Sequence, residues 1–234
     1  PMLRQALILA GGKGTRLGEI TQETPKPLLL VAGKPFIEHL IISLKKQGIK
    51  NIIISTGYKS EKFEEYIGNN PFEGIEIKCI PEPEPLGTGG AVKFIEEHLR
   101  SSFLVLNGDT IFNIKFKDLV DLIAVPKDQI CSVALRRTPD MTRYGQVSLE
   151  GHKILRFAEK ASTSTDDNII NGGIYFMKRD IFELLPSGMS SLENDIFPVL
   201  AKKGILAGKI FDSYFIDIGI PEDLKRAQRE LKKS

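Results

Sequence analysis

Hydrophobic positions in the first half of the chain form short runs that alternate with helical patterns. Apolar runs at residues 5–10 and 103–106 predict buried strands, and residues 51–55 and 75–80 predict two further strands. Apolar residues at helical spacing predict helices at residues 36–47, 59–67 and 88–99, the first opened by Pro35 and ended by Gly48. Strands that alternate with helices favour a parallel sheet covered by helices on both faces.

The second half of the chain carries a different pattern. Apolar runs at residues 130–136, 145–149, 154–157 and 169–177 are joined by short turns, which predicts antiparallel strands. Helical patterns return at residues 179–184, 192–202 and 221–232. We therefore predict an α/β fold with a Rossmann-like, mostly parallel but mixed central sheet, flanked by helices and extended by a small β-rich lobe. Residues 1–234 are expected to form a single domain.

Composition and charge narrow the class of protein. Hydrophobic residues make up 41% of the chain and charged residues 26%, as in ordinary globular proteins with a sizeable core. A net charge of +2 gives no reason to expect nucleic acid or an acidic membrane surface as a partner. The longest uncharged stretch, residues 168–177, is far shorter than the roughly 20 apolar residues of a membrane span. Cys79 and Cys131 lack metal-ligand or redox spacing and predict buried thiols in the cytoplasm.

A glycine-rich turn directly follows the first predicted strand. Glycine lets the backbone approach a ligand closely, so that several N–H groups can converge on phosphate oxygens. Lys13 and Arg16 add positive charge at the same place. The alternative is a tight turn whose basic side chains are merely solvated. The turn reads Leu9-Ala10-Gly11-Gly12-Lys13-Gly14-Thr15-Arg16-Leu17.

Two common phosphate motifs do not fit this turn. A Walker loop requires Ser or Thr after its lysine, where Gly14 stands here. A dinucleotide fingerprint requires a third glycine where Leu17 stands, and an acidic residue near Ser55, where none occurs. A dinucleotide-dependent dehydrogenase is therefore disfavoured.

Six motifs follow one another along the chain. The first is the turn Gly-Gly-x-Gly-Thr-Arg-Leu at residues 11–17 together with Pro25-Lys26-Pro27. The other five are Pro85-Leu86-Gly87-Thr88, Asn107-Gly108-Asp109, Glu159-Lys160, Asn171-Gly172-Gly173 and Asp217-Ile218-Gly219. In these motifs the chain resembles the sugar-1-phosphate nucleotidyltransferases, and within them the heptose 1-phosphate guanylyltransferase group.

This resemblance implies an activity, two substrates and a cofactor. A sugar 1-phosphate oxygen would attack the α-phosphorus of GTP and release pyrophosphate, with Mg²⁺ neutralising part of the charge. Residues 1–112, approximately, would bind the nucleotide, and residues 113–234 the sugar. The nucleotide-binding residues implied are Leu9, Ala10, Gly11, Gly12, Gly14, Thr15, Gly87 and Thr88.

Two basic residues are candidates for catalysis. Arg16 can hold triphosphate oxygens because a guanidinium stays charged and binds phosphate through two N–H groups. Lys26 lies between two prolines that stiffen the backbone. By the resemblance, Lys26 would bridge the sugar phosphate and the reacting phosphorus. The alternative for Lys26 is a surface lysine in a rigid loop.

Two acidic residues are candidates for a Mg²⁺ site. Asp109 follows a buried strand, and a carboxylate at the carboxyl end of a parallel strand points into the crevice where α/β proteins bind ligands. Asp217 ends the apolar run at residues 214–216. Carboxylates, phosphate oxygens and waters are suitable Mg²⁺ ligands. The two aspartates are 108 positions apart, so only the family pattern pairs them. An Asx turn at Asp109 and helix capping by Asp217 are the alternatives.

The stiff segment Pro81-Glu82-Pro83-Glu84-Pro85 is the candidate for recognising the base. Guanine presents adjacent N–H donors that one carboxylate can accept together, whereas a pyrimidine edge is better met by an amide. This favours GTP over UTP or dTTP, with Glu82 preferred to Glu84 as the acceptor. A solvated Pro/Glu turn is the alternative.

Sugar recognition is predicted at strand ends in the second half of the chain. By the resemblance, Glu159 and Asn171 would bond sugar hydroxyls and Lys160 would meet the 1-phosphate. Glu193 is a further candidate, although a carboxylate in the first turn of a helix explains it equally well. The sugar-binding residues predicted are Tyr144, Gly145, Glu159, Lys160, Asn171 and Gly172.

Other functions remain open at this level. A uridylyl- or thymidylyltransferase for another sugar is the nearest alternative, and a non-catalytic nucleotide-sugar sensor is the alternative from a different class. The presence of Arg16, Lys26, Asp109 and Asp217 disfavours the sensor. The sequence does not select one sugar, and it leaves the oligomeric state open, a homodimer included.

Overall fold

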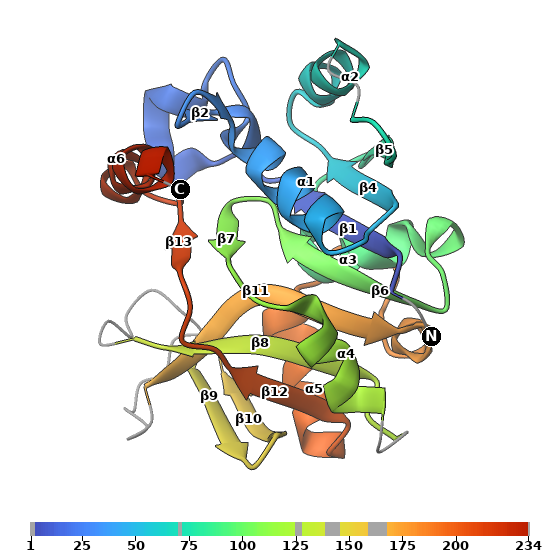
Figure 1. The fold of residues 1–234 in the computed structure, drawn as a ribbon. Helices are drawn as coiled ribbons and strands as arrows, with labels where there is room; N and C mark the ends of the chain where they lie inside the picture. The colour runs from blue at the N-terminus through green and yellow to red at the C-terminus, as the bar shows by residue number, and fades with distance from the viewer. Residues whose placement is uncertain (1–2, 70–71, 125–127, 139–145, 159–167, 234) are drawn as a thin grey trace.

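The computed structural model describes residues 3–69, 72–124, 128–138, 146–158 and 168–233 (Figure 1). The described residues form a nine-stranded mixed sheet in the order β5-β4-β1-β6-β11-β8-β12-β10-β9. Its strands are β1 (Gln5–Ala10), β4 (Asn51–Thr56), β5 (Glu76–Pro81), β6 (Ser102–Asn107), β8 (Cys131–Arg137), β9 (Gln146–Glu150), β10 (Lys153–Ala158), β11 (Ile169–Lys178) and β12 (Leu206–Ile210). Two short pairs, β2 (Leu30–Val31) with β3 (Lys34–Pro35) and β7 (Thr110–Phe112) with β13 (Phe215–Asp217), lie outside this sheet.

Strand direction divides the sheet as the sequence predicts. In the first half, β1 pairs in parallel with β4 and β6, and β4 pairs in parallel with β5. In the second half, β11 runs antiparallel to β6 and β8, and β10 runs antiparallel to β9 and β12. The pair β8–β12 is parallel. The chain passes through β9, β10, β11 and α5 before β12 comes to lie beside β8, so no hairpin joins the two strands. The predicted mixed α/β fold is confirmed.

Successive residues of the strands point to opposite faces and build two hydrophobic layers. Ile8 of β1 packs with α1 (Phe36–Lys46), whereas Leu7 packs with the layer that contains α3 (Gly87–Phe94). In Figure 1, α1 and α4 (Phe116–Ala124) lie in front of the sheet, and α3 and α5 (Phe197–Lys203) lie behind it. The remaining α-helices are α2 (Ser60–Asn69) and α6 (Pro221–Glu230).

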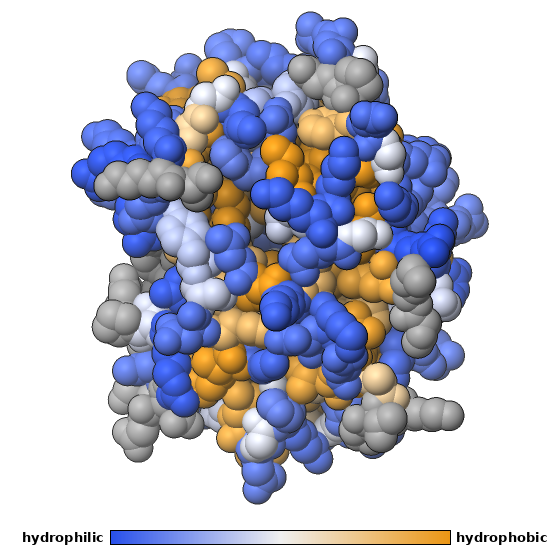
Figure 2. Space-filling view, in the orientation of Figure 1, coloured by the Kyte–Doolittle hydropathy of each residue, from blue (hydrophilic) through white to orange (hydrophobic). Residues whose placement is uncertain are grey.

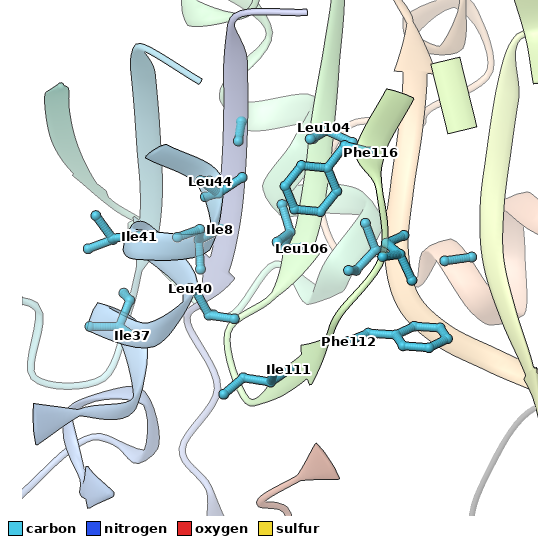
Figure 3. Packing of buried hydrophobic residues seen from close by; sticks show 14 of the residues in the cluster. Ile8, Ile37, Leu40, Ile41, Leu44, Leu104, Leu106, Ile111, Phe112 and Phe116 are labelled. Carbon is cyan, nitrogen blue, oxygen red and sulfur yellow. The ribbon is translucent and has the colours of Figure 1, made fainter. Parts of the chain in front are cut away.

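The front layer follows from the helical spacing of α1. Ile37, Leu40, Ile41 and Leu44 are buried on one side of that helix and face Ile8 of β1 (Figure 3). Hydrophilic residues dominate the surface of this face, and apolar residues show only in patches between them (Figure 2). No helix in the described part of the chain is long and apolar enough to cross a membrane.

Two predicted helices are divided in the structure. The helix predicted at residues 88–99 ends at Phe94, and a 3₁₀ turn at Glu96–His98 follows. The Gln5 side chain bonds the backbone at His98 and Arg100, which ties this segment to β1. The helix predicted at residues 192–202 consists of a π turn, Leu192–Ile196, and α5, because Pro198 has no N–H to continue a regular ladder.

Candidate active site

A cavity of about 380 Å³ lies at the carboxyl ends of β1 and β6. Its volume is within the range of small-molecule sites. It gathers the glycine-rich turn, the Pro-Lys-Pro segment, the Pro/Glu segment, the first turn of α3 and the Asn-Gly-Asp motif. Its lining is Leu9, Ala10, Gly11, Gly12, Gly14, Lys26, Pro27, Glu82, Pro85, Gly87, Thr88, Ala91, Asn107, Gly108 and Asp109.

The glycine-rich turn forms one wall of the cavity, and a larger residue would be disfavoured at two of its positions, Gly11 and Gly14. A Cβ atom at Gly11 would lie 2.4 Å from Glu82 Oε1. Gly14 has a φ of 65°, in the left-handed region, and a Cβ atom there would lie 3.3 Å from Lys26 Cε. The turn therefore lies directly between the acidic wall at Glu82 and the basic group at Lys26. Thr15, which follows in a 3₁₀ helix, does not line the cavity.

Lys26 is a buried lysine, only 9% exposed. It begins a 3₁₀ turn, Lys26–Leu28, and its Nζ donates a hydrogen bond of 2.8 Å to Asp109 Oδ2. Lysine is rarely buried without a partner, so this ion pair accounts for its position. The ammonium carries three hydrogens, so two donors remain beside the bond to Asp109, and Lys26 lines the cavity.

The main chains at Asp109 and Asp217 lie side by side through the pairing of β7 with β13. Asp217 lies opposite Thr110 in this antiparallel pair, and the Ile218 N–H donates to the Asp109 carbonyl at 3.0 Å. The Gly219 N–H donates to Asp217 Oδ1 at 2.5 Å, which fixes the carboxylate. The described residues contain no cluster of three or more His, Cys, Asp or Glu side chains that could hold a metal. Two carboxylates complemented by substrate phosphate oxygens and waters nevertheless suit Mg²⁺.

Arg16 is exposed and lies near Asp217 rather than in the cavity lining. A Cβ atom at Gly219 would lie 3.4 Å from an Arg16 guanidinium nitrogen and 2.7 Å from Asp217 Oδ1. The guanidinium thus lies next to the Asp217 carboxylate.

Glu82 lies in the cavity wall, while Glu84 is exposed and outside it. The Ser55 hydroxyl donates to Glu82 Oε1 at 2.8 Å, and the Leu86 N–H donates to Oε2 at 3.2 Å. These two bonds hold the carboxylate over Gly11. Each oxygen keeps lone-pair capacity for a ligand.

The sugar-side residues that the structure describes lie on β11. A Cβ atom at Gly172 would lie 2.5 Å from the Phe112 ring, and one at Gly173 would lie 2.9 Å from Asn107 Nδ2. The glycines therefore let β11 pass close to β6 and β7 beside the cavity. Asn171 precedes them and donates to the Tyr175 hydroxyl at 2.7 Å. The predicted residues Tyr144, Gly145, Glu159 and Lys160 lie outside the described residues.

A second cavity, of about 650 Å³, lies on the front face between α1 and the segment from β7 to α4. None of the predicted site residues that the structure describes lines it. The first cavity is the better candidate because it gathers the glycine-rich turn, the buried Lys26 and the carboxylates of Glu82 and Asp109.

Comparison with known protein families agrees with this arrangement. The model of the nucleotidyl transferase family matches residues 5–234. The chain belongs to this family. The predicted resemblance is thereby confirmed, and the matched residues include every element that lines the cavity.

Relatives of this nucleotidyl transferase are similar over nearly its whole length. The D-glycero-α-D-manno-heptose 1-phosphate guanylyltransferase of Aneurinibacillus thermoaerophilus is 38% identical, covering 97% of this chain and 98% of the relative. The protein of the same name from Campylobacter jejuni is 41% identical, covering 94% and 96%. The crystal structure of HddC from Yersinia pseudotuberculosis complexed with GMP-PN has a TM-score of 0.84 at 33% identity, covering 98% of this chain and 100% of that one.

Three polar residues of this nucleotidyl transferase site were not predicted from the sequence. Ser55 supports Glu82, Asn107 lines the cavity, and Tyr175 contacts Asn171. Asn107 belongs to the motif Asn107-Gly108-Asp109, so the sequence contains a signal that could have identified it as a site residue. Ser55 ends a buried strand and Tyr175 lies inside an apolar run, so both resemble core residues in the sequence.

Proposed function

We propose that this chain is a Mg²⁺-dependent guanylyltransferase that joins GTP to D-glycero-D-manno-heptose 1-phosphate, giving a GDP-sugar and pyrophosphate. The observation that carries the proposal is the ion pair between the buried Lys26 and the half-buried Asp109, which lines a cavity together with the glycine-rich turn and Glu82. The choice of guanine and heptose is supported by the two relatives of that name and by the HddC complex with GMP-PN.

The proposed reaction is one displacement at phosphorus. An oxygen of the sugar 1-phosphate bonds to the α-phosphorus of GTP, the bond from that phosphorus to the bridging α,β-oxygen breaks, and pyrophosphate leaves with the electron pair. Because two anions must approach one another, charge neutralisation is the main requirement. Lys26 would donate its two remaining hydrogens to phosphate oxygens, and Arg16 would bind the triphosphate from the outer side.

Nucleotidyltransferases of this family generally use a divalent metal. Asp109 and Asp217 are the residues that would hold it here, and the cation would neutralise charge on the phosphates when bound. Two hydrogen bonds support this role: the Ile218 N–H holds the Asp109 main chain, and the Gly219 N–H holds the Asp217 carboxylate.

We assign the nucleotide and the sugar 1-phosphate to different halves of the chain. The nucleotide-binding candidates Gly11, Glu82 and Thr88 belong to the parallel half of the sheet, at about residues 1–112. Asn171 and Gly172 belong to the antiparallel half, at about residues 113–234, where we also propose Tyr144, Gly145, Glu159 and Lys160 as sugar ligands from the family motifs.

The proposal is tested by a screen for pyrophosphate release. Four nucleoside triphosphates are crossed with a panel of sugar 1-phosphates that includes the heptose, with Mg²⁺ present. We expect the highest turnover with GTP and the heptose. Equal turnover with UTP or dTTP would contradict the choice of guanine. If no pair of substrates released pyrophosphate, the result would favour a non-catalytic nucleotide-sugar sensor.

Replacing Glu82 with glutamine is expected to lower kcat/KM for GTP by about 30-fold, because a hydrogen bond to a charged group contributes about 1.5–3 kcal/mol. Glutamine would also turn an N–H donor toward the donors of guanine. The GTP-to-UTP ratio of kcat/KM is the measurement, and Glu84→Gln is the matched control, with an expected change below about twofold. A ratio that stays constant while both substrates weaken would assign Glu82 a purely structural role through Ser55 and Leu86.

A further inference from the structure

A chain of hydrogen bonds connects the nucleotide side of the site to the sugar side. The Glu193 carboxylate accepts from the Thr88 hydroxyl at 2.7 Å and from the Ser191 hydroxyl at 3.0 Å, both at Oε2. Its other oxygen, Oε1, accepts from the Tyr175 hydroxyl at 3.2 Å. Tyr175 in turn accepts from Asn171 Nδ2 at 2.7 Å. One carboxylate on the π turn therefore holds α3 and β11 at the same time.

The Tyr175 hydroxyl is a polar group in an otherwise apolar position. The side chain is fully buried, and its ring packs edge-on against Phe197 of α5 with ring centroids 4.9 Å apart. Phenylalanine would make the same ring contact, so packing does not account for the hydroxyl. Burial and the Glu193 charge raise the pKa of Tyr175 well above its ordinary value. The phenol keeps its proton at neutral pH and serves as a donor to Glu193.

The amide of Asn171 is fixed at both ends. Its Oδ1 accepts from the Gly173 N–H at 2.9 Å, and because that group can only donate, the oxygen must face it. Its Nδ2 therefore faces the Tyr175 hydroxyl. The second amide hydrogen and the second lone pair of Oδ1 remain for a ligand.

We infer that Tyr175 and Glu193 are positioning residues, which hold the Asn171 carboxamide in one orientation for a sugar hydroxyl. This inference rests on the proposed function, which gives Asn171 to the sugar. Neither Tyr175 nor Glu193 needs to touch the sugar: the phenol orients the amide, and the carboxylate orients the phenol. Because Glu193 also holds Thr88 in the wall of the nucleotide cavity, it links the two substrate sites.

Tyr175→Phe removes the hydroxyl and keeps the ring. We expect the KM for the sugar 1-phosphate to rise about tenfold, while the KM for GTP and kcat change less than about threefold. The reason is that the freed amide can rotate and present its donor and acceptor in the wrong places. Tyr66→Phe is the matched control. The Tyr66 hydroxyl of α2 also donates to a carboxylate, that of Glu38 on α1, and this pair lies away from the cavity. An unchanged sugar KM in active, folded Tyr175→Phe would overturn the inference.

A double-mutant cycle separates positioning from general stability. If Tyr175 acts through Asn171, then adding Tyr175→Phe to Asn171→Ala should raise the sugar KM by less than about twofold further. A further tenfold rise on the Asn171→Ala background would show that Tyr175 acts independently of the amide and would overturn the inference. Thermal midpoints of all variants establish that each is folded.

Substitutions at Glu193 give a second measurement that does not depend on Tyr175→Phe folding. Glu193→Leu deletes the acceptor and should raise the sugar KM about tenfold, whereas Glu193→Gln keeps an acceptor for Tyr175 and should raise it less than about threefold. Equal effects would overturn the inference and leave the proposed function standing. A wild-type protein that is inactive with every substrate pair would overturn the proposed function and the inference together.

Discussion

Lys26→Ala is expected to lower kcat by about a thousandfold while the protein stays folded. Removing one preorganised electrostatic group from a transition state commonly costs about 10²–10³ in kcat. Lys26 has the features of such a group: it is 9% exposed, it lies between two prolines, and its Nζ is held 2.8 Å from Asp109 Oδ2. Its charge is therefore in place before the substrates arrive.

Two further lysine variants complete this experiment: one tests the shape of the charged group, and the other is a control at an exposed lysine. Lys26→Arg keeps the charge but replaces a compact ammonium with a larger planar group, so we expect a fall of about 30-fold. Lys117→Ala removes an exposed lysine that pairs with Asp121 on α4, and it should leave turnover unchanged. Single-turnover product formation measures the effect on chemistry. Retention of more than a tenth of wild-type kcat in folded Lys26→Ala would contradict the proposed role.

Local patterns predict the parallel half of the fold because each element there carries its own signal. The strand β1 carries five apolar residues in a row and is followed by Gly11, and α1 has a proline at its start and one buried stripe. The short strand β7 and the helix α4 were not predicted. In α4 the buried residues Phe116, Leu119 and Ile123 do follow helical spacing, so a signal existed there. The three-residue β7 carries no periodicity of its own, because its identity depends on pairing with β13.

Motifs predict which residues line the site, but local sequence does not predict how these residues meet. The glycine-rich turn, Lys26, Glu82 and Asp109 all line the cavity. Their contacts depend on the register between distant strands, which no local pattern contains. The apposition of Asp109 and Asp217 is decided by one pair of three-residue strands, and the Tyr175 hydroxyl finds Glu193 only after β11 enters the sheet.

Asp217→Asn is expected to lower kcat by about a hundredfold and to move the Mg²⁺ dependence to higher concentration. Asparagine keeps the size and one oxygen, so Oδ1 can still accept the Gly219 N–H and the local turn should survive. What is lost is one negative charge of the two that would bind the cation. Stabilisation by a metal ion contributes several kcal/mol, and each 1.36 kcal/mol corresponds to about a factor of ten in rate.

Asp109→Asn should have a larger effect than Asp217→Asn, because Asp109 is also the partner of Lys26. Removing its charge would weaken cation binding and release the lysine from its fixed position in one step. Binding of Mn²⁺ in the presence of GTP, followed by electron paramagnetic resonance, gives a readout that is independent of turnover. The matched control is Asp118→Asn, since Asp118 pairs with Lys209 away from the cavity. Unchanged Mn²⁺ affinity in both Asp109→Asn and Asp217→Asn would place the cation elsewhere and leave the two carboxylates with a purely structural role.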